Sequence, residues 1–107
     1  MELHKISLKI EETIAEIEAV RKAIKPRGEA LAHAQVDYDY AIAKKILEMR
    51  ENYPVTIVEK LARGECITER RALTVAESGY KSCTTNLQAL MAILNAYQSL
   101  NRHQQEL

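Results

Sequence analysis

Apolar residues recur along the first part of the chain at alternating steps of three and four. This spacing places their side chains on one face of a helix and matches the a and d positions of a heptad repeat. Thr13 occupies the one polar slot of the series, and charged residues occupy the other faces. The pattern predicts a helix over about residues 3–25. The apolar members are Leu3, Ile6, Ile10, Ile17, Val20 and Ile24.

A second helical pattern follows at once, over about residues 28–52, separated from the first only by the segment KPRG at residues 25–28. Pro26 lacks an N–H donor and disfavours helical geometry in the residue before it. The segment is therefore either a sharp kink or a short break. We favour a kinked helix or two collinear helices, because no polar stretch of loop length intervenes.

A short amphipathic stretch, over about residues 56–63, follows Pro54. Its β-branched residues would also suit a strand, but the chain offers no second strand to pair with. We therefore predict a short helix. Thr56 is the expected N-cap, with Glu59 at the capping-box position. Gly64 is the expected C-terminal cap.

The last helix is predicted over about residues 68–102, where apolar residues again alternate by four and three. A second line of residues, seven apart, runs beside the first, which predicts contact with more than one neighbouring helix. Small residues in its first half match small residues in the preceding long helix, so these two helices are expected to pack closely. The second line consists of Ala72, Gly79, Asn86, Ile93 and Leu100.

The predicted fold is all-α, with residues 1–107 forming one domain. We expect a long antiparallel helical hairpin with a kinked N-terminal helix and coiled-coil or bundle packing. Such a monomer leaves an apolar face uncovered, which predicts a homo-oligomer, either a dimer or a higher closed assembly. Asn86 is expected to meet the hydroxyl of Tyr38, and Asn86 and Asn95 are candidates for fixing register. The expected core or oligomer interface consists of Ile6, Ile10, Ile17, Leu87, Leu90, Leu94 and Tyr97.

Composition and charge argue against several classes of function. Fifteen acidic residues balance fifteen basic ones, so no net charge draws the chain to nucleic acid or to an anionic membrane. Cys66 and Cys83 lie far apart and indicate reduced thiols rather than a disulfide or zinc site. The three histidines are scattered, and no nucleophile has a positioned base nearby in the pattern. The sequence therefore predicts neither an enzyme nor a cofactor or metal site, and without a signal-peptide or membrane-spanning run it predicts a soluble intracellular protein.

One cluster of basic residues is a candidate anion site: Lys60, Arg63, Arg70 and Arg71 surround the turn before the last helix. The N-terminus of a helix offers unpaired N–H groups and the positive end of its dipole, which together favour a phosphate or carboxylate. Glu59, Glu65 and Glu69 lie among these bases. The alternative is therefore a solvated turn in which ion pairs neutralise the cluster.

Three segments together resemble a group of small all-helical bacteriophage and prophage proteins of roughly a hundred residues. They are YDYAIAKKILEMRE, YPVTIVEKLARGE and ALTVAESGYKSCTTNLQALMAILNAYQ, within residues 28–100, and the turn VTIVEKLARG is the most specific part. The resemblance carries over no catalytic residues. It implies an accessory protein that acts by binding in the cytosol of the host bacterium.

Three functions follow, in order of preference. The first is a homo-oligomeric, non-catalytic protein that binds a host or phage protein and so opposes host defence or modulates host machinery. The second is a sponge that sequesters a nucleotide or cyclic-nucleotide signal between helices, with the basic cluster on its phosphates. The third is a nucleic-acid accessory factor, which the zero net charge disfavours.

Overall fold

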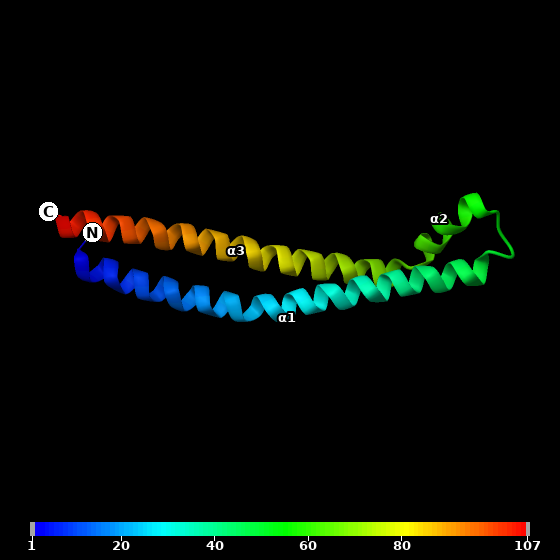
Figure 1. Ribbon diagram of the computed structural model, residues 1–107, viewed down its shortest axis with the longest axis horizontal. Coiled ribbons are helices and arrows are strands. Elements are labelled where there is room, and N and C mark those ends of the chain that lie inside the picture. The colour runs from blue at the N-terminus through cyan, green and yellow to red at the C-terminus, as the bar shows by residue number, and fades with distance from the viewer. Residues whose placement is uncertain (1, 107) are drawn as a thin grey trace. The chain divides into compact units, whose positions relative to one another are not determined.

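The computed structural model describes residues 2–106, and within this range the regular structure is entirely α-helical (Figure 1). Helix α1 spans Leu3–Met49, α2 spans Val55–Glu65 and α3 spans Ile67–Glu106. The all-α prediction is confirmed. Packing divides the chain into a first unit, Met1–Pro26 with Lys81–Leu107, and a second unit, Arg27–Tyr80.

Helix α1 continues through Pro26, so the alternative of a break at this proline is wrong. Proline removes one hydrogen bond of the helix and crowds the carbonyl four residues earlier, but it leaves the bonds on either side intact. Pro26 is exposed, and strong helix formers such as Ala23 and Lys25 precede it. The predicted boundary near residue 52 lies three residues beyond the observed end at Met49.

The connection between α1 and α2 ends at Pro54, which is the N-cap of α2 and has extended backbone angles of φ −61° and ψ 145°. The Pro54 carbonyl accepts hydrogen bonds from the backbone N–H groups of Ile57 and Val58 at 3.1 and 3.2 Å. The predicted cap at Thr56 is therefore wrong, because Thr56 already lies inside the helix. No side chain caps this helix.

Helices α2 and α3 are separated by a single residue, Cys66. Its backbone N–H donates to the Arg63 carbonyl at 3.2 Å, and its own carbonyl accepts from the Arg70 N–H at 3.0 Å. Cys66 therefore forms a backbone hydrogen bond with the last turn of α2 and another with the first turn of α3. The predicted cap at Gly64 is wrong: Gly64 lies within α2 and has no positive φ, so nothing there requires glycine geometry.

In the first unit, residues 3–26 of α1 and 81–106 of α3 lie side by side and run antiparallel (Figure 1). Ile6, Thr13, Ile17 and Leu90 are buried. The hydroxyl of Thr13 donates to the Lys9 carbonyl at 2.7 Å, so the one polar slot of the heptad series is satisfied inside its own helix.

The second unit has its own core, in which Tyr38 and Ile42 of α1 pack with Cys66 and Leu73. Half-buried side chains of α1 complete this cluster. Val58 and Ala62 of α2 are also buried. The α1 and α3 segments of this unit run antiparallel, since Gly28 lies beside Tyr80 and, ten residues further along α1, Tyr38 meets Arg70. The half-buried members are Leu31, Ala34, Ala41 and Ile46.

Asparagine burial differs from the prediction. Asn86 and Asn95 are exposed in the single chain, and Asn86 is not a buried partner for Tyr38. Asn101 instead takes a core-side position of α3: its Oδ1 atom is buried and has no hydrogen-bond partner among the described residues. Periodicity could not separate these asparagines, because Asn86 lies at the edge of the helix interface and Asn101 continues the central line.

Candidate functional site

Helix α2 has one apolar flank that the second unit does not cover. Val58 and Ala62 of this helix are buried, whereas Ile57 and Leu61 are exposed. Ile57 and Leu61 are four residues apart, so they lie one turn apart on the same face of α2. Gly64 extends this line by three residues, and a Cβ atom placed on it would meet nothing within 4 Å. We call Ile57, Leu61 and Gly64 the α2 apolar row.

A groove lies where the end of α1 meets the start of α2. Ile46, Arg50, Val55, Val58 and Glu59 line it, and its volume is about 350 Å³. Val55 is 89% exposed, so an apolar side chain at the rim of the groove stands almost wholly in water. Apolar walls with one basic and one acidic residue suit an apolar side chain of a protein partner, held in orientation by the two charges.

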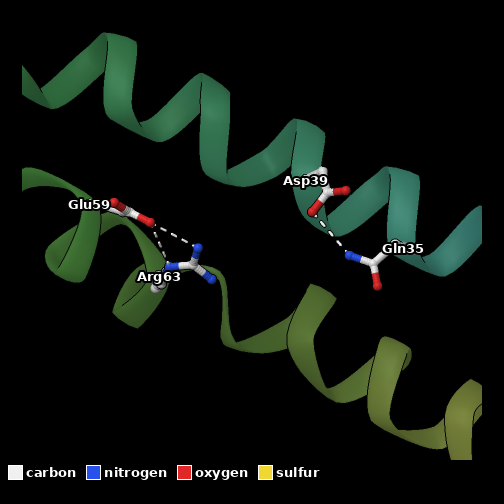
Figure 2. A network of polar contacts seen from close by, with 4 residues as sticks. All are labelled: Gln35, Asp39, Glu59 and Arg63. Carbon is white, nitrogen blue, oxygen red and sulfur yellow. Dashed lines mark hydrogen bonds and ion pairs between the residues drawn. The ribbon is translucent and has the colours of Figure 1, made fainter.

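Arg63, a member of the predicted anion cluster, is held by Glu59 on the same helix. Its Nη2 and Nε atoms both donate to Glu59 Oε1, at 2.9 and 3.3 Å, as Figure 2 shows. Glu59 raises the pKa of Arg63, and the hydroxyl of Tyr38 adds to this effect. A second exposed contact in the same view joins Gln35 Nε2 to Asp39 Oδ1 at 3.0 Å.

The structure brings only part of the basic cluster together. The guanidinium carbon of Arg70 lies 5.5 Å from the centroid of the Tyr38 ring, and the hydroxyl of the same tyrosine contributes to the raised pKa of Arg63. Lys60 and Arg71 are exposed and form no ion pair with another described residue. These four bases line neither the groove between α1 and α2 nor the two grooves beside Cys66 and Tyr40.

Mixed charges surround the buried thiol of Cys66. Lys45 Nζ lies 3.3 Å from Glu48 Oε2 and 3.4 Å from Glu65 Oε2, and these two carboxylates raise the pKa of Lys45. Burial raises the pKa of the Cys66 thiol, and Glu69 raises it further. A raised pKa keeps the sulfur protonated and weakly nucleophilic at neutral pH. The adjoining groove, of about 190 Å³, therefore does not surround an activated thiol.

A neighbouring groove of about 380 Å³ is lined by Asp37, Tyr40, Ala41, Lys44 and Glu69. Two acids and one base give it no excess of positive charge. An anion would gain little there.

The seven residues predicted for the core or oligomer interface fall into two groups, all in the first unit. Ile6, Ile17 and Leu90 are buried between α1 and α3. The remaining four keep part of their apolar surface in water, as expected of positions that a single pair of helices cannot enclose. These half-buried residues are Ile10, Leu87, Leu94 and Tyr97.

Sequence reasoning missed the α2 apolar row. The available signal was the set of apolar residues Ile57, Val58, Leu61 and Ala62. Together they form an apolar stripe wider than a short helix needs to pack against one neighbouring surface. Treating Gly64 only as a cap hid its place at the end of this stripe.

Between residues 2 and 106, no group of three or more histidine, cysteine, aspartate or glutamate side chains is placed to hold a metal ion. No helix in that range carries an apolar stretch of the length and hydropathy that crossing a membrane requires. Comparison with models of known protein families, with characterised proteins and with solved structures finds no match to this chain.

Proposed function

We propose that this chain is a non-catalytic binding protein that works as a homo-oligomeric helical bundle and captures a host or phage protein. The observation that carries the proposal is the apolar surface left open by the fold. Large apolar side chains that stand exposed on the described residues outnumber the buried hydrophobic ones. Contiguous apolar surface on a protein of this kind marks an interaction site.

The exposed area supports the same proposal quantitatively. The chain exposes 7987 Å², whereas a globular monomer of 12.2 kDa exposes about 6,100 Å². The excess, roughly 1,900 Å², is more than twice the ~800 Å² that a standard interface covers on each partner and falls in the range of large obligate interfaces. Coiled-coil packing between copies would use the heptad positions that remain half-buried in the first unit.

The α2 apolar row and the neighbouring groove are the proposed docking surface for the protein partner. The row offers two large side chains one turn apart, and Gly64 at its end lets another backbone approach closely. The resemblance of the VTIVEKLARG segment to phage proteins suggests that this partner is found in an infected bacterial cell.

A pull-down with matched variants tests the docking surface. The tagged chain, a variant carrying Ile57→Lys and Leu61→Lys, and a control carrying Val36→Lys and Val75→Lys are incubated with extracts of infected and uninfected bacteria. The control residues are exposed apolar positions of the same unit outside the row. We expect a protein that the wild type and the control retain and the row variant loses. Equal recovery of every bound protein by all three would overturn the proposal.

Nucleotide sequestration is the second candidate, and one observation favours it. Glu65, expected to neutralise the basic cluster, is drawn to Lys45 instead, so Lys60 and Arg71 have no ionic partner among the described residues. A thermal-shift screen with nucleotides and cyclic dinucleotides tests this role. A ligand at 100 times its dissociation constant adds about 2.7 kcal/mol to the free energy of unfolding. Arg70→Ala with Arg71→Ala should abolish that gain; no shift with any compound would remove this candidate.

A further inference from the structure

One side of the helix pair in the first unit is apolar on both helices and is incompletely covered. Leu3, Ile14 and Met91 are exposed, and Ile10, Leu87 and Leu94 are half-buried. We call these six residues the first-unit apolar face.

Helix geometry places these residues on the same side of the pair. Ile14 precedes the buried Ile17 by three positions, and Leu87 precedes the buried Leu90 by three. Met91 directly follows Leu90. On one helix, the position three before a core residue and the position one after it lie on the same flank of the core stripe. When two such helices pack antiparallel, these flanks of the two helices lie on the same side of the pair. The exposed side chains of α1 and α3 therefore adjoin one another and do not point to opposite faces.

Asn101 adds an independent observation in the same unit. It continues the line of Leu87 and Leu94 by a further step of seven, and its Oδ1 atom is buried without a hydrogen-bond donor among the described residues. In helical assemblies, an asparagine at a core-facing position commonly fixes register and oligomer number.

We infer that a second copy of this chain docks on the first-unit apolar face, so that two α1–α3 pairs form a four-helix bundle related by two-fold symmetry. This inference rests on the proposed homo-oligomer and specifies where the copies meet.

A second copy fits this face better than another occupant for two reasons. The face follows the same heptad repeat that packs α1 on α3 within the chain, and a second copy brings that repeat in a matching register. A two-fold interface also needs one self-complementary patch, and the six residues of the face are uncharged aliphatic side chains and Met91. The excess area of the chain is large enough to supply such an interface.

The exposed apolar residues allow a matched experiment. A face variant carries Ile14→Lys and Met91→Lys, whose parent side chains are 40% and 44% exposed. A control variant carries Leu8→Lys and Ile93→Lys, whose parent side chains are each 44% exposed but lie on other sides of the same helices. Circular dichroism confirms helix content in each full-length protein, and sedimentation equilibrium over a wide range of concentrations gives the mass.

We expect the wild type and the control to sediment as dimers and the face variant to sediment as a monomer of unchanged helicity. A face variant that remains as dimeric as the control would overturn this inference while leaving the homo-oligomer intact. A wild type that is monomeric at every concentration would overturn both. If the face variant loses its helices, the milder Met91→Gln against Ile93→Gln repeats the comparison, and equal dimer dissociation constants would overturn the inference.

Discussion

Arg70 of α3 lies over the ring of Tyr38 of α1, with its guanidinium carbon 5.5 Å from the ring centroid. The hydroxyl of the same tyrosine contributes to the raised pKa of Arg63 of α2. Tyr38 of α1 therefore interacts with side chains of both other helices of the second unit. Its ring is buried in the core with Ile42, Cys66 and Leu73, and the Arg70 cation lies over the face of the ring.

Replacing Arg70 with methionine keeps most of the side-chain volume but removes the cation over the ring. We expect the free energy of unfolding to fall by about 0.5–1 kcal/mol, the usual size of an exposed cation–π contact. Urea denaturation measures the change. Arg71→Met is the control, because Arg71 is equally basic and exposed but forms no cation–π pair with Tyr38. Equal losses in the two variants would show that the contact contributes nothing.

Leu73→Ala tests the core of the second unit. Leu73 is 1% exposed and belongs to the Tyr38 cluster, so we expect a loss of about 2–5 kcal/mol from transfer and cavity terms. Val75→Ala, two positions further along α3, removes an apolar side chain that is 67% exposed and should change stability by less than about 0.5 kcal/mol. Chemical denaturation followed by circular dichroism compares the two; similar losses would contradict the described packing.

Gly64→Ala should stabilise the isolated chain by up to about 1 kcal/mol. Alanine is the better helix former, and its Cβ would meet nothing within 4 Å. The same methyl group would stand on the α2 apolar row, where it should weaken binding of the proposed protein partner. Thermal unfolding and a pull-down measure the two effects separately. Loss of stability would mean that the helix does not extend past Gly64.

The raised pKa of Cys66 predicts a fall in stability at alkaline pH. The folded state keeps the thiol protonated, whereas the unfolded chain ionises it near the ordinary value of 9.0. The contribution to stability is therefore fully present below pH 9.0 and decreases as the pH rises through the folded-state value. Denaturation curves on either side of pH 9 should show this decrease in the wild type and in Cys83→Ala, but a smaller one in Cys66→Ala. An identical decrease in Cys66→Ala would assign it to other groups.

The heptad spacing sufficed to predict the helices, because a repeat sustained over many turns leaves few other ways to bury Ile6, Ile17 and Leu90 together. Local signals at the helix ends were less informative. Thr56 and Gly64 are residue types that often cap helices, yet both lie inside α2. The backbone hydrogen bonds at its two ends are instead made by the carbonyl of Pro54 and the N–H group of Cys66. Capping preferences amount to about 1 kcal/mol, so packing of Val58 and Ala62 overrides them.

The site was harder to predict than the fold. Charge alone grouped Lys60, Arg63, Arg70 and Arg71, whereas the structure assigns Arg63 to Glu59 and Arg70 to Tyr38. Such pairings depend on how the helices rotate about their axes, which the sequence does not specify. The same rotation buries the Oδ1 atom of Asn101 and leaves Asn86 exposed.

The mass of the wild-type chain in solution tests the central claim, that this protein functions as an assembly of helices from more than one copy. Sedimentation equilibrium at low and high concentration gives that mass directly. We expect a species of twice the 12.2 kDa chain mass, or a higher multiple, whether or not it dissociates on dilution. A single species of 12.2 kDa at every concentration would contradict it.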